Sequence, residues 1–164
     1  MGMAGGGPGA TSAFRAPSQV QPVISDDSGY PAELNFLAMS GHFPIGGKPL
    51  ILHVEDDKAQ AEMLKSILEG SGFTVVQAST AEEALRTFQQ EPSISVVLAD
   101  HMLSGKTGTQ LAAQIKKIKR TVPVVMHSGH PPVSMNNIDG FMDKGEPPAT
   151  LVDFIAELVR RFWQ

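Results

Sequence analysis

Carboxylates follow two apolar runs of the sequence at the point where each run ends. Glu55 and Asp56 come directly after the run 50–54. Asp100 comes directly after the run 96–99. Short apolar runs bounded by turn residues are typical of buried strands, and ligands bind where the carboxyl ends of parallel strands meet. Because carboxylates that face one another repel unless a cation lies between them, this spacing predicts a cation site.

A hydroxyl and an amine complete the polar groups that follow predicted strands. Ser128 comes after the apolar run 122–126, and Lys144 comes after the short run 140–143. Carboxylate oxygens suit Mg²⁺, while a lysine and a hydroxyl hold the phosphoryl oxygens that the metal leaves uncovered. The five groups together predict a site for phosphoryl transfer.

Strand and helix patterns alternate from residue 48 onward and would place these groups at one edge of a sheet. Strands are predicted at 50–54, 73–78, 94–99, 122–126 and 140–143. Helices are predicted at about 58–68, 81–91, 107–119 and 149–162. Helical periodicity assigns Met63, Ile118 and Phe162 to buried faces, and Gly70 is expected to stop the first helix. The alternation favours an α/β fold with a parallel sheet covered by helices on both faces.

Composition indicates one globular domain with an extension. The chain has 164 residues, 41% of them hydrophobic, a formal net charge of -4 and no cysteine. Residues 1–47 are rich in glycine and proline and are predicted to be a largely disordered extension with a short helix at 31–40, followed by the domain 48–164. No apolar stretch approaches the ~20 residues that span a bilayer, so we expect a soluble, cytoplasmic protein without a membrane partner.

The charge pattern gives no support to a nucleic-acid partner. The mild acidity offers no electrostatic attraction for a polyanion. The basic run 116–120 closes a predicted helix, where cations complement the helix dipole, and this ordinary role is enough to explain it.

The stretch from about residue 49 to residue 162 resembles the receiver domain of two-component response regulators, in particular the stand-alone, chemotaxis-regulator-like kind. The resemblance implies a flavodoxin-like, five-stranded parallel sheet in the order 2-1-3-4-5. It also implies a phosphoprotein in which Asp100 accepts a phosphoryl group from a sensor histidine kinase or a histidine phosphotransfer protein. Such a protein is not an enzyme beyond its own phosphorylation and dephosphorylation, and it signals by phosphorylation-dependent binding of a downstream protein or by phosphorelay.

The resemblance also assigns the ligands of the metal. Asp56 is similar to a direct Mg²⁺ ligand and Glu55 to a ligand that acts through water. Asp100 itself contributes to the metal site, and Met102 is expected to contribute its backbone carbonyl. Magnesium is therefore the expected cofactor.

The remaining assignments concern the phosphoryl group and the switch. Lys144 resembles the lysine that pairs with the acceptor, and Ser128 the hydroxyl that swings toward the phosphate. Phe141 takes the place of the aromatic switch residue. Met102 and His130 stand at the positions that tune the lifetime of the acyl phosphate in the family. His53, His101 and His127 lack the spacing of metal ligands and are expected to be structural or exposed.

The chain departs from the family's pattern in three places. Leu103 replaces a usual proline, and Gly145 replaces the usual cis-proline after Lys144. Because a cis bond before a non-proline residue costs about 3 kcal/mol, we expect this peptide to be trans. The segment 129–140 lacks helical periodicity, so the family's fourth helix is predicted to be shortened or absent. We expect this to leave apolar sheet surface exposed, with residues 31–40 docking there or near the last helix.

Other functions remain open at the level of sequence. The runner-up is a pseudo-receiver that acts as a phosphorylation-independent interaction module. An aspartate-nucleophile phosphatase is disfavoured because Asp-x-Asp is missing where such enzymes have it. A flavin-binding flavodoxin is disfavoured because an acidic loop follows the first strand, where phosphate binding would favour Ser, Thr and Gly. The stand-alone interpretation follows from the absence of an output domain after residue 162 and from the shortness of the extension before residue 48.

Overall fold

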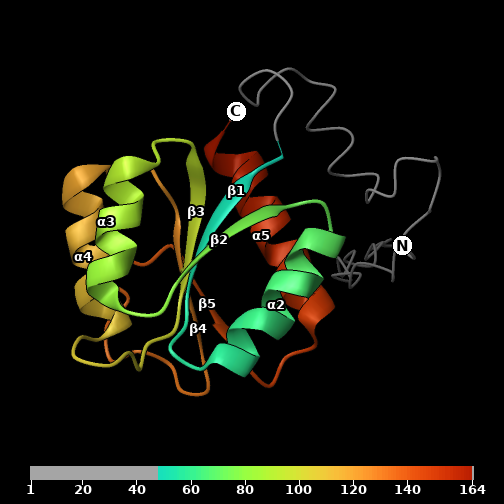
Figure 1. The fold of residues 1–164 in the computed structure, drawn as a ribbon, viewed down its shortest axis with the longest axis horizontal. Coiled ribbons are helices and arrows are strands. Elements are labelled where there is room, and N and C mark those ends of the chain that lie inside the picture. The colour runs from blue at the N-terminus through green and yellow to red at the C-terminus, as the bar shows by residue number, and fades with distance from the viewer. Residues whose placement is uncertain (1–47, 164) are drawn as a thin grey trace, which may run out of the picture.

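The computed structural model describes residues 48–163, which form a parallel sheet between two layers of helices (Figure 1). The strands are β1 (Leu50–Val54), β2 (Thr74–Ala78), β3 (Ile94–Ala99), β4 (Val124–Ser128) and β5 (Gly140–Asp143). The helices are α2 (Lys58–Gly70), α3 (Ala81–Gln90), α4 (Gly108–Ile118) and α5 (Pro148–Phe162). All neighbouring strands are parallel and lie in the order β2-β1-β3-β4-β5. This confirms the predicted flavodoxin-like α/β fold.

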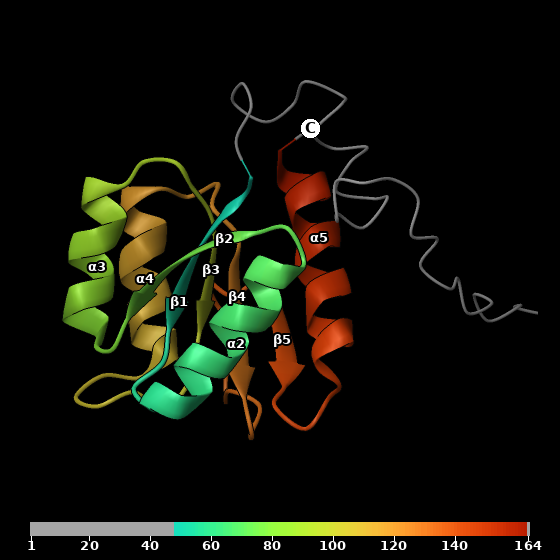
Figure 2. The same ribbon diagram turned by 45° about the vertical axis from the view of Figure 1, so that its right-hand side comes forward.

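Each face of the sheet is covered by two helices. The helices α2 and α5 cover one face, and α3 and α4 cover the other (Figure 2). The alternation of side chains along each strand divides the apolar residues between the two layers, so that Ile51 faces α2 and α5 while Leu52 faces α3 and α4. All six residues of the central strand β3 are buried, as expected for a strand covered on both faces.

Helix ends follow the capping residues in the sequence. Asp57 caps α2 by accepting the backbone N–H of Gln60 at 2.9 Å, and Thr80 caps α3. Gly70 does not stop α2 as predicted, because it is the last helical residue and the reversal comes at Gly72, which has φ +96°. A glycine can adopt this left-handed conformation without a steric penalty, whereas Gly70 has no need of it.

Several predicted boundaries and faces are corrected by the structure. The strand β4 begins at Val124 instead of residue 122, because Pro123 has no N–H to donate to the sheet. At its other end the strand extends to Ser128, two residues further than predicted. Met63, Ile118 and Phe162 are 59%, 47% and 39% exposed, so their assignment to buried faces was wrong. In each helix the core is filled by other apolar residues, such as Ala61, Leu64 and Leu68 in α2.

No helix lies between β4 and β5, which confirms the prediction for this segment. The expected bare sheet surface is not found, however, because Val124 and Met126 on this face of β4 are fully buried with residues of α4. The exposed apolar side chains lie in the loop itself, at Val133 and Met135. The predicted extension 1–47 and its docking through residues 31–40 lie outside the described residues.

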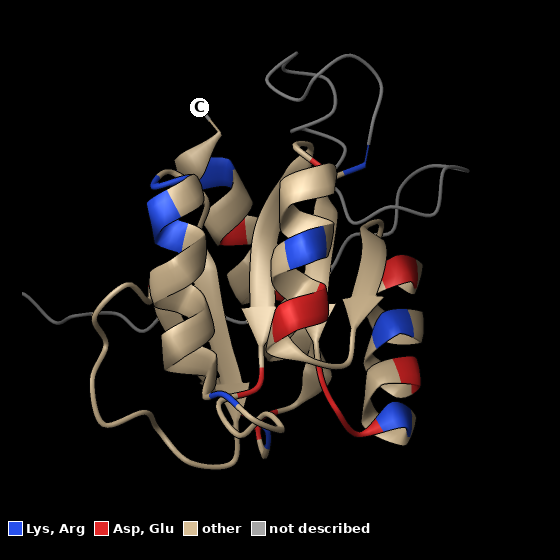
Figure 3. Cartoon of the chain, turned by 60° about the vertical axis from the view of Figure 1, so that its left-hand side comes forward, with Lys and Arg blue, Asp and Glu red and all other residues tan. Residues whose placement is uncertain are grey.

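Basic residues gather near the C-terminal ends of two helices (Figure 3). The last turns of α4 and α5 carry basic residues, Lys116 and Lys117 in one and Arg160 and Arg161 in the other. This confirms that the basic run closes a helix, where cations complement the dipole. Among residues 48–163, no helix combines the length and apolar character needed to cross a membrane.

Candidate functional site

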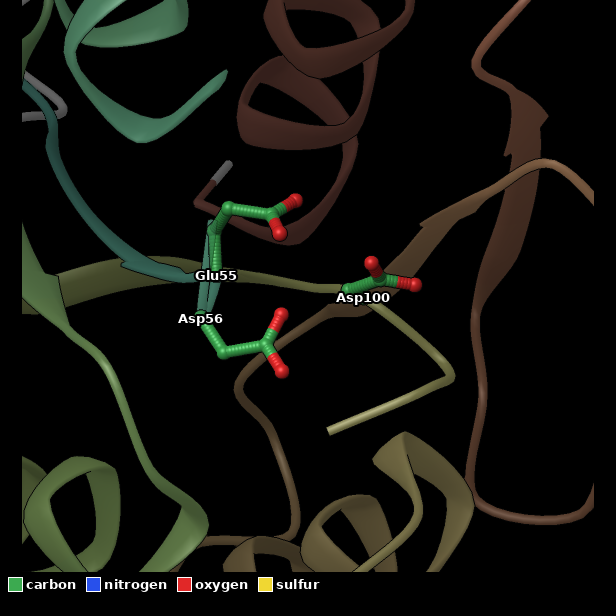
Figure 4. Close-up of side chains that lie close together, drawn as sticks. All are labelled: Glu55, Asp56 and Asp100. Atoms are coloured by element: carbon green, nitrogen blue, oxygen red, sulfur yellow. The ribbon is translucent and has the colours of Figure 1, made fainter. Parts of the chain in front are cut away.

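The three predicted carboxylates meet at the carboxyl edge of the sheet (Figure 4). Glu55 follows β1 and Asp100 follows β3, and the parallel register that pairs Val54 with Ala99 brings them side by side. Oxygens of Glu55, Asp56 and Asp100 all lie within 4.8 Å of one another. Glu55 and Asp100 are only 5% and 8% exposed, whereas Asp56 is exposed.

Lys144 reaches this cluster from the end of β5. Its ammonium donates to Asp100 Oδ2 at 2.7 Å, to Glu55 Oε2 at 2.7 Å and to Gln60 Oε1 at 2.8 Å. An ammonium group has three N–H donors, so every donor of Lys144 has an acceptor in this arrangement. In the described part of the chain Lys144 is thus the cation that balances the two buried carboxylates.

Burial and pairing act in opposite directions on the pKa values at the site. Burial raises the pKa of Glu55, and the hydrogen bond from Lys144 only partly offsets it. Burial also acts to raise the pKa of Asp100, but hydrogen bonds from Lys144, the Met102 amide and the Ser128 hydroxyl outweigh it, so that pKa is lowered. Burial disfavours the charged form of Lys144, but hydrogen bonds to Asp100 and Glu55 outweigh it and raise the lysine's pKa. Asp100 is therefore held as a carboxylate.

The donor set of the cluster fits a hard divalent cation. Three carboxylates that converge within 4.8 Å supply oxygen ligands of the kind that Mg²⁺ takes in proteins. Asp56, whose Oδ2 accepts a 3.1 Å hydrogen bond from the Ser104 hydroxyl, is open to solvent and leaves room for water in the coordination shell. The contribution of the Met102 carbonyl stays a prediction, while its amide N–H donates to Asp100 Oδ1 at 3.1 Å.

Of the predicted hydroxyl and switch residues, Ser128 lies beside the cluster, where its hydroxyl hydrogen-bonds to Asp100. Ser128 is the last residue of β4 and is 3% exposed, and its carbonyl accepts the backbone N–H of Lys144 at 3.1 Å. Phe141 lies in β5, partly buried, and packs against the core beneath α3 and α4. His130 is exposed in the loop after β4. His101 Nδ1 lies 3.3 Å from the Thr109 hydroxyl, at the start of α4.

The turn after Lys144 is built without a cis peptide. All peptide bonds in the described range are trans, as predicted for the bond before Gly145. The backbone N–H of Gly145 donates to Asp143 Oδ1 at 2.7 Å, and that of Glu146 donates to the Asp143 carbonyl at 3.1 Å. Asp143 thus closes the turn after Lys144 with a trans peptide at Gly145.

Sequence reasoning missed Gln60 and the environment of two histidines. His53 is 2% exposed, and burial lowers the pKa of His53 and of His127 to about 4, helped at His53 by His127 and at both by the charge of Lys144. The alternation of β1 could have indicated this, since His53 has the same parity as Ile51, which faces α2 and α5. No sequence signal marks Gln60, because its role depends on how α2 lies over the site.

Comparison with known proteins agrees with this geometry. Residues 51–155 match the model of the response regulator receiver domain. The chain is 31% identical over 85 residues to the two-component response regulator ORR5 of Oryza sativa, which covers 51% of this chain and 63% of the relative. It is 35% identical over 78 residues to the uncharacterized transcriptional regulatory protein YbdJ of Bacillus subtilis, covering 48% and 34%. The match thus spans less than two thirds of these relatives' own lengths.

Solved structures show the same fold. A CheY-like response regulator receiver domain protein from Methanospirillum hungatei superposes with a TM-score of 0.67 at 29% identity, covering 71% of this chain and 97% of that one. A receiver domain protein from Clostridium thermocellum gives 0.65 at 26% identity, covering 69% and 95%. The fold and the acidic edge define a receiver-type α/β domain. The chain belongs to the response regulator receiver domain family.

Proposed function

We propose that this chain accepts a phosphoryl group on Asp100 from a histidine kinase or a histidine phosphotransfer protein, in a Mg²⁺-dependent reaction. It then signals by phosphorylation-dependent protein binding or by relay to a further histidine. The observation that carries the proposal is the convergence of Glu55, Asp56, Asp100 and Lys144 within hydrogen-bonding and metal-ligating distance.

The site supplies what the transfer requires. The P–N bond of the phosphohistidine breaks as a P–O bond to Asp100 forms, and the histidine leaves as imidazole after taking up a proton. Asp100 is the nucleophile and is held ionised by Lys144 and the Met102 amide. The Lys144 ammonium and the Ser128 hydroxyl can each donate a hydrogen bond to the phosphoryl oxygens. A bound Mg²⁺, held by Glu55, Asp56 and Asp100, supplies charge neutralisation on the transferred group.

The pseudo-receiver is the weaker alternative. A module that no longer responds to phosphate has no need of an ionised, lysine-paired acceptor. It gains support only from the segment between β4 and β5, where the helix is missing. Because the acceptor groups are all in place, we favour phosphorylation as the input.

Phosphorylation by a small-molecule donor tests the proposal. Wild type incubated with acetyl phosphate and Mg²⁺ should gain the mass of one phosphoryl group, and chelation of the metal should prevent this. Asp100→Ala should stay unmodified, while Asp153→Ala, which removes an exposed acid on α5, should be modified like wild type. Equal modification of wild type and Asp100→Ala would contradict the proposal.

A further inference from the structure

Hydrogen bonds hold the backbone at Lys144 but do not themselves fix the direction of its side chain. The Lys144 N–H donates to the Ser128 carbonyl at 3.1 Å, and the turn beyond it is closed by the Asp143 carboxylate on the Gly145 N–H. A lysine side chain is long and flexible, so a fixed backbone alone does not aim its ammonium group. The direction of this group must come from the acceptors around it.

Two of the three acceptors are also candidate metal ligands. Glu55 Oε2 and Asp100 Oδ2 each lie 2.7 Å from the Lys144 ammonium, and both carboxylates belong to the acidic cluster. A bound cation and an incoming phosphoryl group compete with the lysine for these oxygens. The third acceptor, Gln60 Oε1 at 2.8 Å, lies outside the acidic cluster. It can keep its hydrogen bond while the two carboxylates change partners.

Gln60 lies on a part of the fold that is firmly placed. It belongs to the first turn of α2, where its own N–H donates to the Asp57 cap at 2.9 Å. The same helix is anchored in the core by Leu64 and Leu68, which are 5% and 0% exposed. An acceptor on such an element holds its position better than one on a loop.

Lys144 also borders a pocket beside α2. This pocket, between α2 and the start of α5, is lined by both Gln60 and Lys144 and also by the carboxylate-bearing Glu146. If Gln60 accepted no hydrogen bond from Lys144, the ammonium could turn from Asp100 toward Glu146 or solvent. The geometry of the site therefore depends on which acceptor holds the lysine.

We propose that Gln60 is a positioning residue for phosphoryl transfer: its side-chain carbonyl holds the Lys144 ammonium toward Asp100 while the carboxylates take metal and phosphoryl group. This inference rests on the proposed function. Because a glycine follows Lys144, the direction of the ammonium group depends on its own hydrogen bonds. The inference assigns one of these, the bond to the neutral side chain of Gln60 on α2, the role of aiming the lysine.

Three variants test the inference in the full chain. Gln60→Met removes the acceptor but keeps length and helix propensity, and Gln60→Glu restores a carbonyl-type oxygen. Gln89→Met removes an exposed glutamine of α3 as a matched control. With acetyl phosphate and Mg²⁺, Gln60→Met should be phosphorylated about tenfold more slowly, as expected for one lost hydrogen bond to a charged group. Gln60→Glu and Gln89→Met should stay within about twofold of wild type.

A second readout reports on the lysine directly. At one fixed pH, nuclear magnetic resonance of the Lys144 ammonium group should show a changed chemical shift and faster exchange with water in Gln60→Met, and a signal close to wild type in Gln60→Glu. A wild-type rate and an unchanged Lys144 signal in Gln60→Met would overturn the inference, and so would an equal loss of rate in Gln89→Met. If wild type itself takes up no phosphoryl group, the proposed function fails, and the Lys144 signal still decides whether Gln60 positions the lysine.

Discussion

The ammonium group of Lys144 lies 2.7 Å from the carboxylate of Asp100, although 44 residues separate them in the chain. The contact joins the ends of β3 and β5, two strands that do not pair with each other because β4 lies between them. The side chain of the lysine bridges this distance and ends between Asp100 and Glu55. In the absence of a metal ion, Lys144 neutralises a cluster that would otherwise repel itself.

Replacing Lys144 by methionine should therefore destabilise the protein in the presence of a chelator. Two buried carboxylates lose their counterion, so we expect the free energy of unfolding to fall by about 2 kcal/mol, less than for a fully buried pair because the lysine is partly exposed. The variant should also bind Mg²⁺ more tightly, since the metal no longer competes with the ammonium. Urea unfolding with and without Mg²⁺ and titration calorimetry measure the two effects.

The matched control is Lys106→Met. Lys106 pairs with Glu82 at 3.3 Å on the surface, and such pairs contribute about 0–1 kcal/mol. It should leave both stability and Mg²⁺ affinity close to those of wild type. Weaker Mg²⁺ binding by Lys144→Met would contradict the idea that the lysine competes with the metal.

Neighbouring acids at the end of β1 should respond differently to mutation. Asp56→Ala should abolish Mg²⁺ binding without loss of stability in chelator, because Asp56 is exposed and its carboxylate accepts a hydrogen bond from the exposed Ser104 hydroxyl. Asp57→Ala should keep the metal ligands but lower the free energy of unfolding by about 1 kcal/mol, because it removes the cap of α2. Thermal melts in chelator and calorimetry with Mg²⁺ separate the two roles. A strongly destabilised Asp56→Ala would show that Asp56 is structural.

Strand periodicity and chain order were sufficient to predict the fold and the groups that follow the strands. Apolar runs that end in acids place Glu55 and Asp100 at one edge as soon as the strands are parallel, and the structure brings them together. The sequence could not show that Lys144 is held by Gln60, since this contact depends on the direction in which α2 leaves β1. It is a contact across 84 residues that no local pattern encodes.

The exposed surface was harder to predict than the site. The missing helix between β4 and β5 was correctly predicted from the lack of periodicity, but its consequence for the sheet was not. Met126 is fully buried because α4 extends over β4. Which helix covers which strand is decided by the twist and packing of the sheet, and helical periodicity within one segment does not contain that information.

Acid should destabilise the protein through two histidines on the face of α2 and α5. The pKa of His53 and of His127 is lowered from 6.5 to about 4, in both cases by burial first. For His53 the neighbouring His127 and then Lys144 lower it further, and for His127 the charge of Lys144 does so. The unfolded chain then binds more protons than the folded one between these values. Stability is therefore complete above about pH 6.5 and is lost as pH falls toward 4, by roughly 3 kcal/mol for His53. Nearby carboxylates partly oppose this lowering of the histidine pKa values. Asp100 raises the pKa of both rings, and Asp143 raises that of His127.

Urea unfolding in chelator at several pH values measures this loss. Glu55 contributes with the opposite sign, since its pKa is raised above 4.5 and the folded state takes up its proton more readily just above that pH. His53→Leu removes the titrating imidazole of His53, so its free energy of unfolding should decrease less than that of wild type between pH 6.5 and 4. An identical pH profile for the two proteins would rule out His53 as a source of acid sensitivity.

The start of α4 should not tolerate a side chain at Gly108. A Cβ atom added there would collide with the backbone carbonyl of Asp100 and would lie 2.6 Å from Met126 Sδ. The methionine side chain can move, but the carbonyl belongs to the segment that carries the acceptor. We expect Gly108→Ala to lower the free energy of unfolding by about 2 kcal/mol and to slow phosphorylation of Asp100 by displacing its backbone.

Gly129→Ala provides the control, because nothing lies within 4 Å of a Cβ at that position. Both substitutions reduce the freedom of the unfolded chain to the same extent, so the difference between them reports on the folded state alone. Gly129→Ala should stay within about 0.5 kcal/mol of wild type in urea unfolding. Equal stability and equal phosphorylation rates for the two variants would mean that the backbone after β3 can yield to α4, and that the position of Asp100 does not depend on this close approach.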